Sequence, residues 1–151
     1  MSRRGSALVY ALIFLGLAVV VAPLVSVMPS KAQRQKAALR DRARELGLRV
    51  SVRPAPEVPA RFRFVPDGEL VSYERLLEKA LHQPERSLRY LWCDGGWQPT
   101  RGESEPPQWL ALLPVGAQLV ELSERAVSIF WNERGAVEDL ECMRQAIDNI
   151  G

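Results

Sequence analysis

The chain has 151 residues and a formal net charge of +2, which allows one compact domain with appendages but not two ordinary domains. Its two cysteines, Cys93 and Cys142, exclude a disulfide framework, and we expect both to be ordinary core thiols.

The net charge conceals a strong asymmetry along the chain. Residues 31–53 carry eight Lys or Arg against two acids, whereas residues 54–151 carry ten Lys or Arg against 16 Asp or Glu. This distribution predicts a basic tether joined to a mildly acidic globular body. We therefore predict a transmembrane anchor (1–29), a basic juxtamembrane helix (30–47) and a small α+β cytoplasmic domain (48–151).

Residues 7–28, ALVYALIFLGLAVVVAPLVSVM, form an uncharged and predominantly apolar run. About 20 helical residues span the roughly 30 Å of a bilayer core, and a lone spanning segment must be helical to satisfy its backbone. A cleaved signal peptide has an apolar core of about 7–15 residues followed by a small-x-small site. The site here, SKA ending at Ala32, lies inside the basic segment. We therefore favour a retained single-pass anchor over a signal peptide or a buried soluble helix.

The cations that flank this run predict its orientation. Arg3 and Arg4 precede the run, whereas seven Lys or Arg follow it between residues 31 and 49. Cytoplasmic flanks collect Lys and Arg, so the pattern predicts an inner-membrane protein with its N-terminus outside and its C-terminal domain in the cytoplasm. The opposite orientation stays open, and it would place both cysteines in an oxidising compartment.

The segment PSKAQRQKAALRDRARELG predicts a helix with both ends marked. Ser30 is a candidate N-cap, with Gln33 completing a capping box, and Gly47 suits the left-handed position after the last turn. A thin apolar stripe that includes Leu39 and Ala43 is too weak for deep membrane insertion.

The cations of this helix are candidate contacts for anionic lipid headgroups. An equally open alternative is a solvated helix whose charges only fix topology. Nucleic-acid binding is not expected, because no aromatic side chain for base stacking is interleaved with the charges. The candidate membrane-surface residues are Lys31, Arg34, Lys36, Arg40, Arg42 and Arg44.

Alternating apolar and polar residues predict strands in the body. In LRVSVR, for example, Leu48, Val50 and Val52 alternate with polar positions, and the DGG sequence after Cys93 suits a hairpin turn. Strands are predicted at 48–53, 60–65, 87–93, 117–122 and 126–132.

Helical patterns are interleaved with these strands. SYERLLEKALHQ (72–83) predicts a short helix with Leu76, Leu77 and Leu81 facing inward, and a strand at 69–73 competes with it. Further predicted elements are a polar loop (98–108), a helical turn in PPQWLALLP and an amphipathic helix (136–150). The fold class is therefore α+β, with an antiparallel or mixed sheet of four to five strands packed against helices.

No combination of residues predicts catalysis. His82 is the only histidine, so a nucleophilic triad would have to include it, with Cys93 as the conceivable nucleophile. The carboxylates Glu103 and Glu105 lie in the polar loop, and no metal-binding spacing occurs. We predict no catalytic residue, no cofactor and no metal; an enzyme at the membrane surface stays as an alternative.

The tryptophans point to a binding surface. Trp131 alternates with core positions, whereas Trp92 could face outward, and Trp97 and Trp109 flank the polar loop. Exposed tryptophans are frequent at protein interfaces. Trp92, Trp97 and Trp109 are therefore candidate partner-binding residues, although packing in the core or over the sheet is the interpretation we favour.

The junction PSKAQRQKAALRDRA, directly after an apolar helix, resembles the Pro-x-x-x-Gln-Arg junction of the YajC family, an accessory subunit of the bacterial preprotein translocase. This resemblance covers the first third of the chain and implies a translocase-accessory role. The family's GDxVxTxGG stretch is missing beyond residue 47. The segments LGLRVSV and VSIFWNERG also resemble uncharacterised single-pass inner-membrane proteins of proteobacteria.

The sequence therefore predicts a non-enzymatic membrane protein that acts as an accessory, scaffold or interaction module of an inner-membrane complex. Its expected partners are the lipid bilayer, anionic headgroups and a membrane protein.

Overall fold

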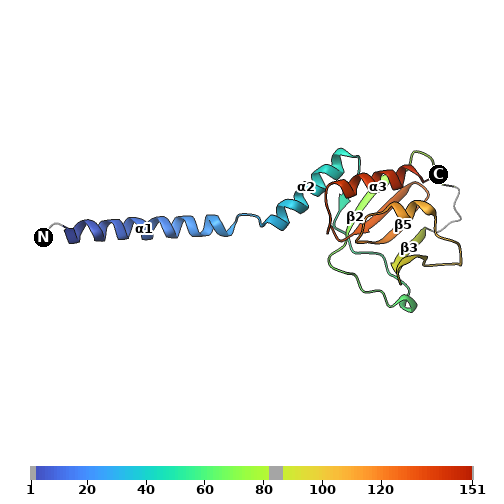
Figure 1. The fold of residues 1–151 in the computed structure, drawn as a ribbon, viewed down its shortest axis with the longest axis horizontal. Helices are drawn as coiled ribbons and strands as arrows, with labels where there is room; N and C mark the ends of the chain where they lie inside the picture. Colours follow the sequence, from blue (N-terminus) through green and yellow to red (C-terminus); the bar gives the residue numbers. More distant parts are fainter. Residues whose placement is uncertain (1–2, 82–86, 151) are drawn as a thin grey trace. The chain divides into compact units, whose positions relative to one another are not determined.

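A computed structural model describes residues 3–81 and 87–150. The chain divides into two compact units, Met1–Gln35 and Lys36–Gly151. The first unit contains helix α1 (Arg3–Ser26), and helix α2 (Lys31–Glu45) begins in it and continues into the second unit. The second unit has the α+β fold predicted from the sequence (Figure 1).

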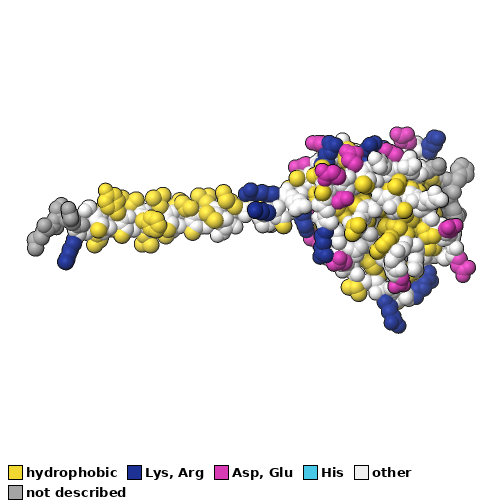
Figure 2. Space-filling view, in the orientation of Figure 1, with side chains coloured by type: hydrophobic (Ala, Val, Ile, Leu, Met, Phe, Trp, Pro, Cys, Tyr) yellow, Lys and Arg dark blue, Asp and Glu magenta, His cyan; other side chains and the backbone are white. Residues whose placement is uncertain are grey.

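Helix α1 contains residues 7–26 of the apolar run predicted at 7–28. Within the described residues, Arg4–Ser26 is the one helical segment long and apolar enough to cross a membrane, and a signal sequence passes the same test. Its 23 residues extend about 35 Å at about 1.5 Å per residue. Apolar side chains cover the helix on the visible face (Figure 2). The most apolar part of the helix is not buried at all, whereas a core helix would be mostly buried.

The predicted ends of α2 are confirmed. The backbone N–H of Ser30 donates to Gln33 Oε1 at 2.9 Å, and the N–H of Gln33 donates to Ser30 Oγ at 3.2 Å. This reciprocal pair is the capping box, which satisfies two N–H groups that a helix start leaves free. Gly47 follows the helix with a φ of +77°, a conformation that glycine adopts without a steric cost.

The described residues form one antiparallel sheet of six strands, in the order β1-β2-β6-β5-β3-β4. The prediction of four to five strands is therefore wrong in number. The additional strands are β2, where a helix was predicted, and β4, which continues the hairpin beyond the DGG turn. The strands are β1 (Arg49–Ser51), β2 (Val71–Leu76), β3 (Leu88–Cys93), β4 (Gly96–Pro99), β5 (Ala117–Leu122) and β6 (Ala126–Trp131).

The helix predicted at 72–83 is wrong, because none of the described residues 72–81 is helical, and the competing strand at 69–73 is the better prediction; residues 82–83 lie outside the described residues. Strand β2 pairs with β6 along all six of its residues, with Tyr73 opposite Ile129. This pairing outweighs local helix propensity, because it buries Val71 and Tyr73 completely. Leu76, predicted to face inward, is 77% exposed at the strand's end.

The strand predicted at 60–65 is also wrong. The structure has a short 3-10 helix, η1 (Ala60–Phe62), and Arg63 follows it with a φ of 46°. Phe62 and Phe64 do share one side, because both pack on the sheet face that carries Leu91 and Phe130. A segment that lies over a sheet can show the same alternation as a strand that pairs within it.

The opposite sheet face holds the main core. Helices α2 and α3 (Glu138–Asp148) and the 3-10 helix η2 (Gln108–Leu112) all contribute buried residues to it. The inward-facing residues of α3 confirm the predicted amphipathic pattern, and Leu39 and Ala43 of α2 are fully buried. The thin apolar stripe of the basic helix is therefore a packing surface against the domain. The buried residues from the helices are Leu39, Ala43, Trp109, Leu110, Leu140, Met143, Ala146 and Ile147.

A buried ion pair holds α2 to the sheet. Glu133, whose side chain is completely buried, accepts two hydrogen bonds from the guanidinium of Arg40, both at 2.8 Å. The hydroxyl of Tyr73 donates to the same carboxylate at 2.8 Å. Burial and this hydrogen bond raise the pKa of Tyr73, and the hydrogen bond with Glu133 raises the pKa of Arg40. We call these residues the Arg40–Glu133–Tyr73 triad.

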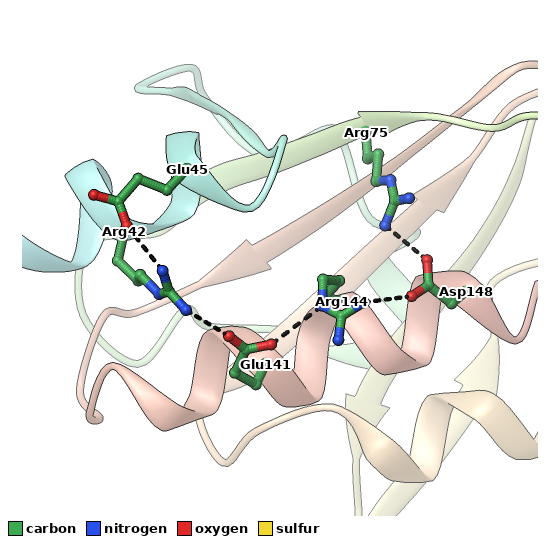
Figure 3. Close-up of polar contacts among 6 residues, drawn as sticks. All are labelled: Arg42, Glu45, Arg75, Glu141, Arg144 and Asp148. Carbon is green, nitrogen blue, oxygen red and sulfur yellow. Dashed lines mark hydrogen bonds and ion pairs between the residues drawn. The ribbon is translucent and has the colours of Figure 1, made fainter.

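A second, more exposed chain of ion pairs runs along α3 (Figure 3). Arg42 of α2 bonds Glu141 at 2.9 Å, and Arg75 of β2 bonds Asp148 at 2.8 Å. Arg144 joins the two carboxylates along the helix. The bonds from Arg144 and Arg42 lower the pKa of Glu141. This series of ion pairs therefore links α2, α3 and β2 near the surface, where each pair alone contributes little to the free energy of unfolding.

Replacing Glu133 with Ala should lower the free energy of unfolding by about 3–5 kcal/mol, because Arg40 and Tyr73 would keep buried polar groups without an acceptor. Urea unfolding of the full chain in detergent, followed by tryptophan fluorescence, measures this change. The matched control is Asp41→Ala, which removes an exposed ion pair with Arg44 and should change stability little. Equal effects from the two variants would contradict the structural role of the triad.

Candidate functional site

An apolar groove lies between the β3–β4 hairpin and the segment that leads into β5. Its volume is about 600 Å³, within the range of binding sites for small molecules. Two tryptophans and three prolines dominate its lining, and Glu105 supplies its only carboxylate among the described residues. The side chains that define this groove are Trp92, Trp97, Pro106, Pro107, Leu113, Pro114 and Val115.

Trp92 and Trp97 form one wall of the groove. They are opposite each other in the β3–β4 register, and their rings meet edge to face with centroids 5.6 Å apart. Trp92 is 45% exposed, whereas Tyr90, two residues earlier on the same face, is buried. The layer that covers the sheet therefore ends between these residues and leaves Trp92 accessible.

The hairpin turn places the two tryptophans opposite each other. Asp94 and Gly95 have φ values of 52° and 78°, the two positive values that a two-residue type I′ turn requires. The hairpin predicted from the DGG sequence is therefore confirmed. Because such a turn fixes the register, Cys93 pairs with Gly96 and Trp92 pairs with Trp97.

The facing wall is held by residues that follow β6 or end it. The indole N–H of Trp131 donates to the carbonyl oxygen of Val115 at 3.0 Å, and the N–H of Asn132 donates to that of Gly116 at 3.2 Å. Gly116 has a φ of +91°, and a Cβ there would overlap the side chain of Asn132. The groove is therefore fixed by buried groups behind it, while Val115 in front is 92% exposed.

The third candidate tryptophan has a different environment. Trp109 is only 8% exposed and belongs to the main core, where η2 packs against α3. Its neighbour Leu110 is also buried and contacts the groove from behind. The structure therefore brings Trp92 and Trp97 together at one surface and places Trp109 in the core.

The six candidate membrane-surface residues fall into two groups. Arg40, Arg42 and Arg44 form ion pairs with Glu133, with Glu45 and Glu141, and with Asp41. By contrast, no ion pair within the described residues involves Lys31, Arg34 or Lys36. The contact of these three cations with lipid headgroups stays a prediction.

Of the residues considered for catalysis, Glu105 lines the groove and Cys93 does not. His82 lies outside the described residues, and Cys93 packs on the second sheet face, against the Leu91 cluster. Burial and the nearby Asp94 raise the pKa of Cys93, which disfavours the reactive thiolate. Both cysteines are free and half-buried. Among the described residues, no group of three or more His, Cys, Asp or Glu could hold a metal ion.

Comparison of this chain with protein-family models, curated proteins and solved structures finds no match. The resemblance to the YajC family therefore stays an expectation from the sequence.

Sequence reasoning missed the proline wall of the groove. The sequence predicts a polar loop at 98–108, but β4 extends to Pro99, η2 begins at Gln108, and Pro106 and Pro107 line the groove beside the tryptophans. The sequence pattern that could have predicted this wall is the recurrence of proline beside large apolar residues, as in Pro114-Val115. Their convergence with Trp92 depends on the pairing of β3 with β5, which is a long-range feature.

The two tryptophan environments predict opposite mutational effects. Replacing Trp109 with Ala should lower the free energy of unfolding by about 3–5 kcal/mol, because it leaves a large cavity in the core. Replacing Trp92 with Phe should change it by no more than about 0.5 kcal/mol, since an exposed ring retains most of its contacts. Urea unfolding of the full chain measures both, and a large loss for Trp92→Phe would contradict a surface role for this residue.

Proposed function

We propose that this protein is a single-pass protein of the bacterial inner membrane whose α+β domain is a non-enzymatic accessory subunit. In this proposal the domain binds another membrane protein through the groove beside Trp92 and Trp97. The observation that carries the proposal is the exposed Trp92 in a preformed apolar groove. Interface energy concentrates in such aromatic anchors, and a contiguous exposed apolar surface is rare on a protein without a partner.

The composition of the groove supports binding rather than catalysis. Apart from Glu105, its lining contains Gln108 and no His, Cys, Ser or Lys among the described residues. A side-chain nucleophile is commonly activated by an adjacent base, and acid–base catalysis commonly uses paired titratable groups. Glu105 has no such neighbour in the lining, whereas apolar rings are what a protein partner requires.

Helix α1 supports the membrane location. It is long enough to cross the hydrocarbon core, and Lys31, Arg34 and Lys36 follow it within ten residues. Lys and Arg near the end of a span favour the cytoplasmic side, and nearby acids contribute little to this effect. We therefore propose that the domain lies in the cytoplasm.

A C-terminal alkaline phosphatase fusion tests the anchor and its orientation together. We expect the fusion to stay in the membrane fraction after carbonate extraction and to be inactive, because the enzyme needs an oxidising compartment. Leu15→Arg, which places a charge near the middle of the helix at a cost of about 2.5–3.5 kcal/mol, should release protein from the membrane. Active fusion would reverse the orientation, and an N-terminus shortened to near residue 33 would identify a signal sequence.

Site-specific photo-crosslinking tests the partner surface. A benzophenone amino acid at position 115 should give a discrete adduct with a membrane protein in intact cells. Val65 is the matched control, because it is 82% exposed and does not line the groove. Adducts of equal yield from both positions, or none from position 115, would contradict the proposal. Mass spectrometry of the adduct identifies the partner.

A further inference from the structure

We infer that the groove binds a proline-rich segment in the polyproline II conformation, flanked by basic residues, on the partner protein. This inference rests on the proposed function and specifies its partner. Three independent features of the groove carry it: the shape of its lining, the hydrogen-bonding state of its indoles and the charge at its rim.

The lining suits proline rings. Trp92 and Trp97 meet at an interplanar angle of 71°, so their faces point in different directions and leave an angular recess between them. Pro106, Pro107 and Pro114 add flat and rigid surfaces around it. Grooves lined by aromatic rings are the recurrent receptors for polyproline II segments, whose rigid rings pack on such rings at little entropic cost.

The indole N–H groups provide directional recognition. Trp131 donates its N–H to Val115, but neither Trp92 nor Trp97 has an acceptor among the described residues. Neither Nε1 is a buried donor left without a partner, so both N–H groups are open to solvent and to a ligand. A polyproline II segment makes no internal hydrogen bonds and presents its carbonyl oxygens outward, so it can supply acceptors in place of water.

The charge at the rim selects the flanks of the ligand. Glu105 lines the groove, Asp94 lies in the adjoining hairpin turn, and Glu103 lies two residues before Glu105. Arg101 is the one cation in residues 94–105, so this segment, which supplies Trp97 and Glu105 to the groove, carries a net negative charge. Electrostatic complementarity therefore favours Lys or Arg beside the prolines. Exposed apolar side chains could also contact a lipid surface. The negative charge beside the groove disfavours such a contact when the lipids are anionic.

The polar depression on the second sheet face is a weaker candidate for a binding site. It is filled by an internal network, in which Arg53 bonds Glu74 at 2.8 Å and Ser128 at 3.0 Å and lies over the ring of Phe130. Arg53, Glu74 and Glu121 already have partners within the chain, so a ligand would have to displace them, and Arg49 is the one lining charge without an ion pair among the described residues.

Fluorescence anisotropy with a labelled peptide tests the inference directly. The probe is Arg-Arg-Pro-Pro-Leu-Pro-Pro-Arg, and the receptor is the full chain in nanodiscs of neutral lipid. We expect saturable binding, and we expect no binding of a Gly/Ser peptide with the same arginines. Trp92→Phe should weaken binding about fivefold, because it removes one hydrogen-bond donor and keeps the ring. Trp92→Ala should weaken it at least about 30-fold, as expected for an interface anchor.

A charge exchange separates the two parts of the recognition. Glu105→Lys should weaken binding of the arginine-flanked peptide about fivefold and leave a glutamine-flanked peptide unchanged. Its matched control is Glu124→Lys, an exposed carboxylate in the turn at the opposite end of β5, which should change neither. Equal effects of the two charge variants would overturn the assigned role of the rim.

The outcomes separate this inference from the proposed function. Failure of the peptide to bind at millimolar concentration, with crosslinking from position 115 intact, would overturn the polyproline assignment and leave the partner surface standing. Loss of both would overturn the two together. Co-flotation of the nanodiscs with anionic vesicles that requires Trp92, without peptide binding, would instead assign the groove to a lipid surface.

Discussion

The fold of the second unit depends on the compensation of one buried carboxylate. Glu133 lies at the exit of β6 in a left-handed conformation, with a φ of 56°, and its side chain has no access to water. A charge in such a place is tolerated only when strong hydrogen bonds replace its hydration. Arg40 and Tyr73 supply them from α2 and β2, so that one side chain unites three elements distant in sequence.

The same short connection between β6 and α3 also supports the groove. Trp131 and Asn132 hold the backbone of Val115 and Gly116, and Glu133 follows immediately with its contacts to α2. The contacts that hold the groove and the buried ion pair with α2 are therefore made by three consecutive residues, 131–133. One short connection therefore contacts both α2 and the backbone behind the groove.

Local signals were predicted well, and long-range ones were not. The capping box of Ser30, the left-handed Gly47 and the Asp94-Gly95 turn were all readable from the sequence, because each depends on a few adjacent residues. Strand β2 was misjudged because its register with β6 outweighs the propensity of SYERLLEKA. Only part of the groove could be predicted from the sequence. Trp92 and Trp97 are close in sequence, whereas the prolines lie beside them only because strand pairing in the sheet brings these distant segments together. The burial of Trp109 likewise reflects the packing of η2 on α3, which no local pattern encodes.

The residues of the triad are far apart in the sequence, and this separation determines when the domain can fold during its synthesis. Arg40 and Glu133 are 93 residues apart, so their bond forms only after nearly the whole chain has left the ribosome. At about 5–20 residues per second, roughly 5–20 s pass between the synthesis of the two residues. At the start of that interval α1 is complete, while no strand of the sheet has been made. For the proposed membrane anchor, this order would let the helix reach the bilayer before the domain that follows it can fold.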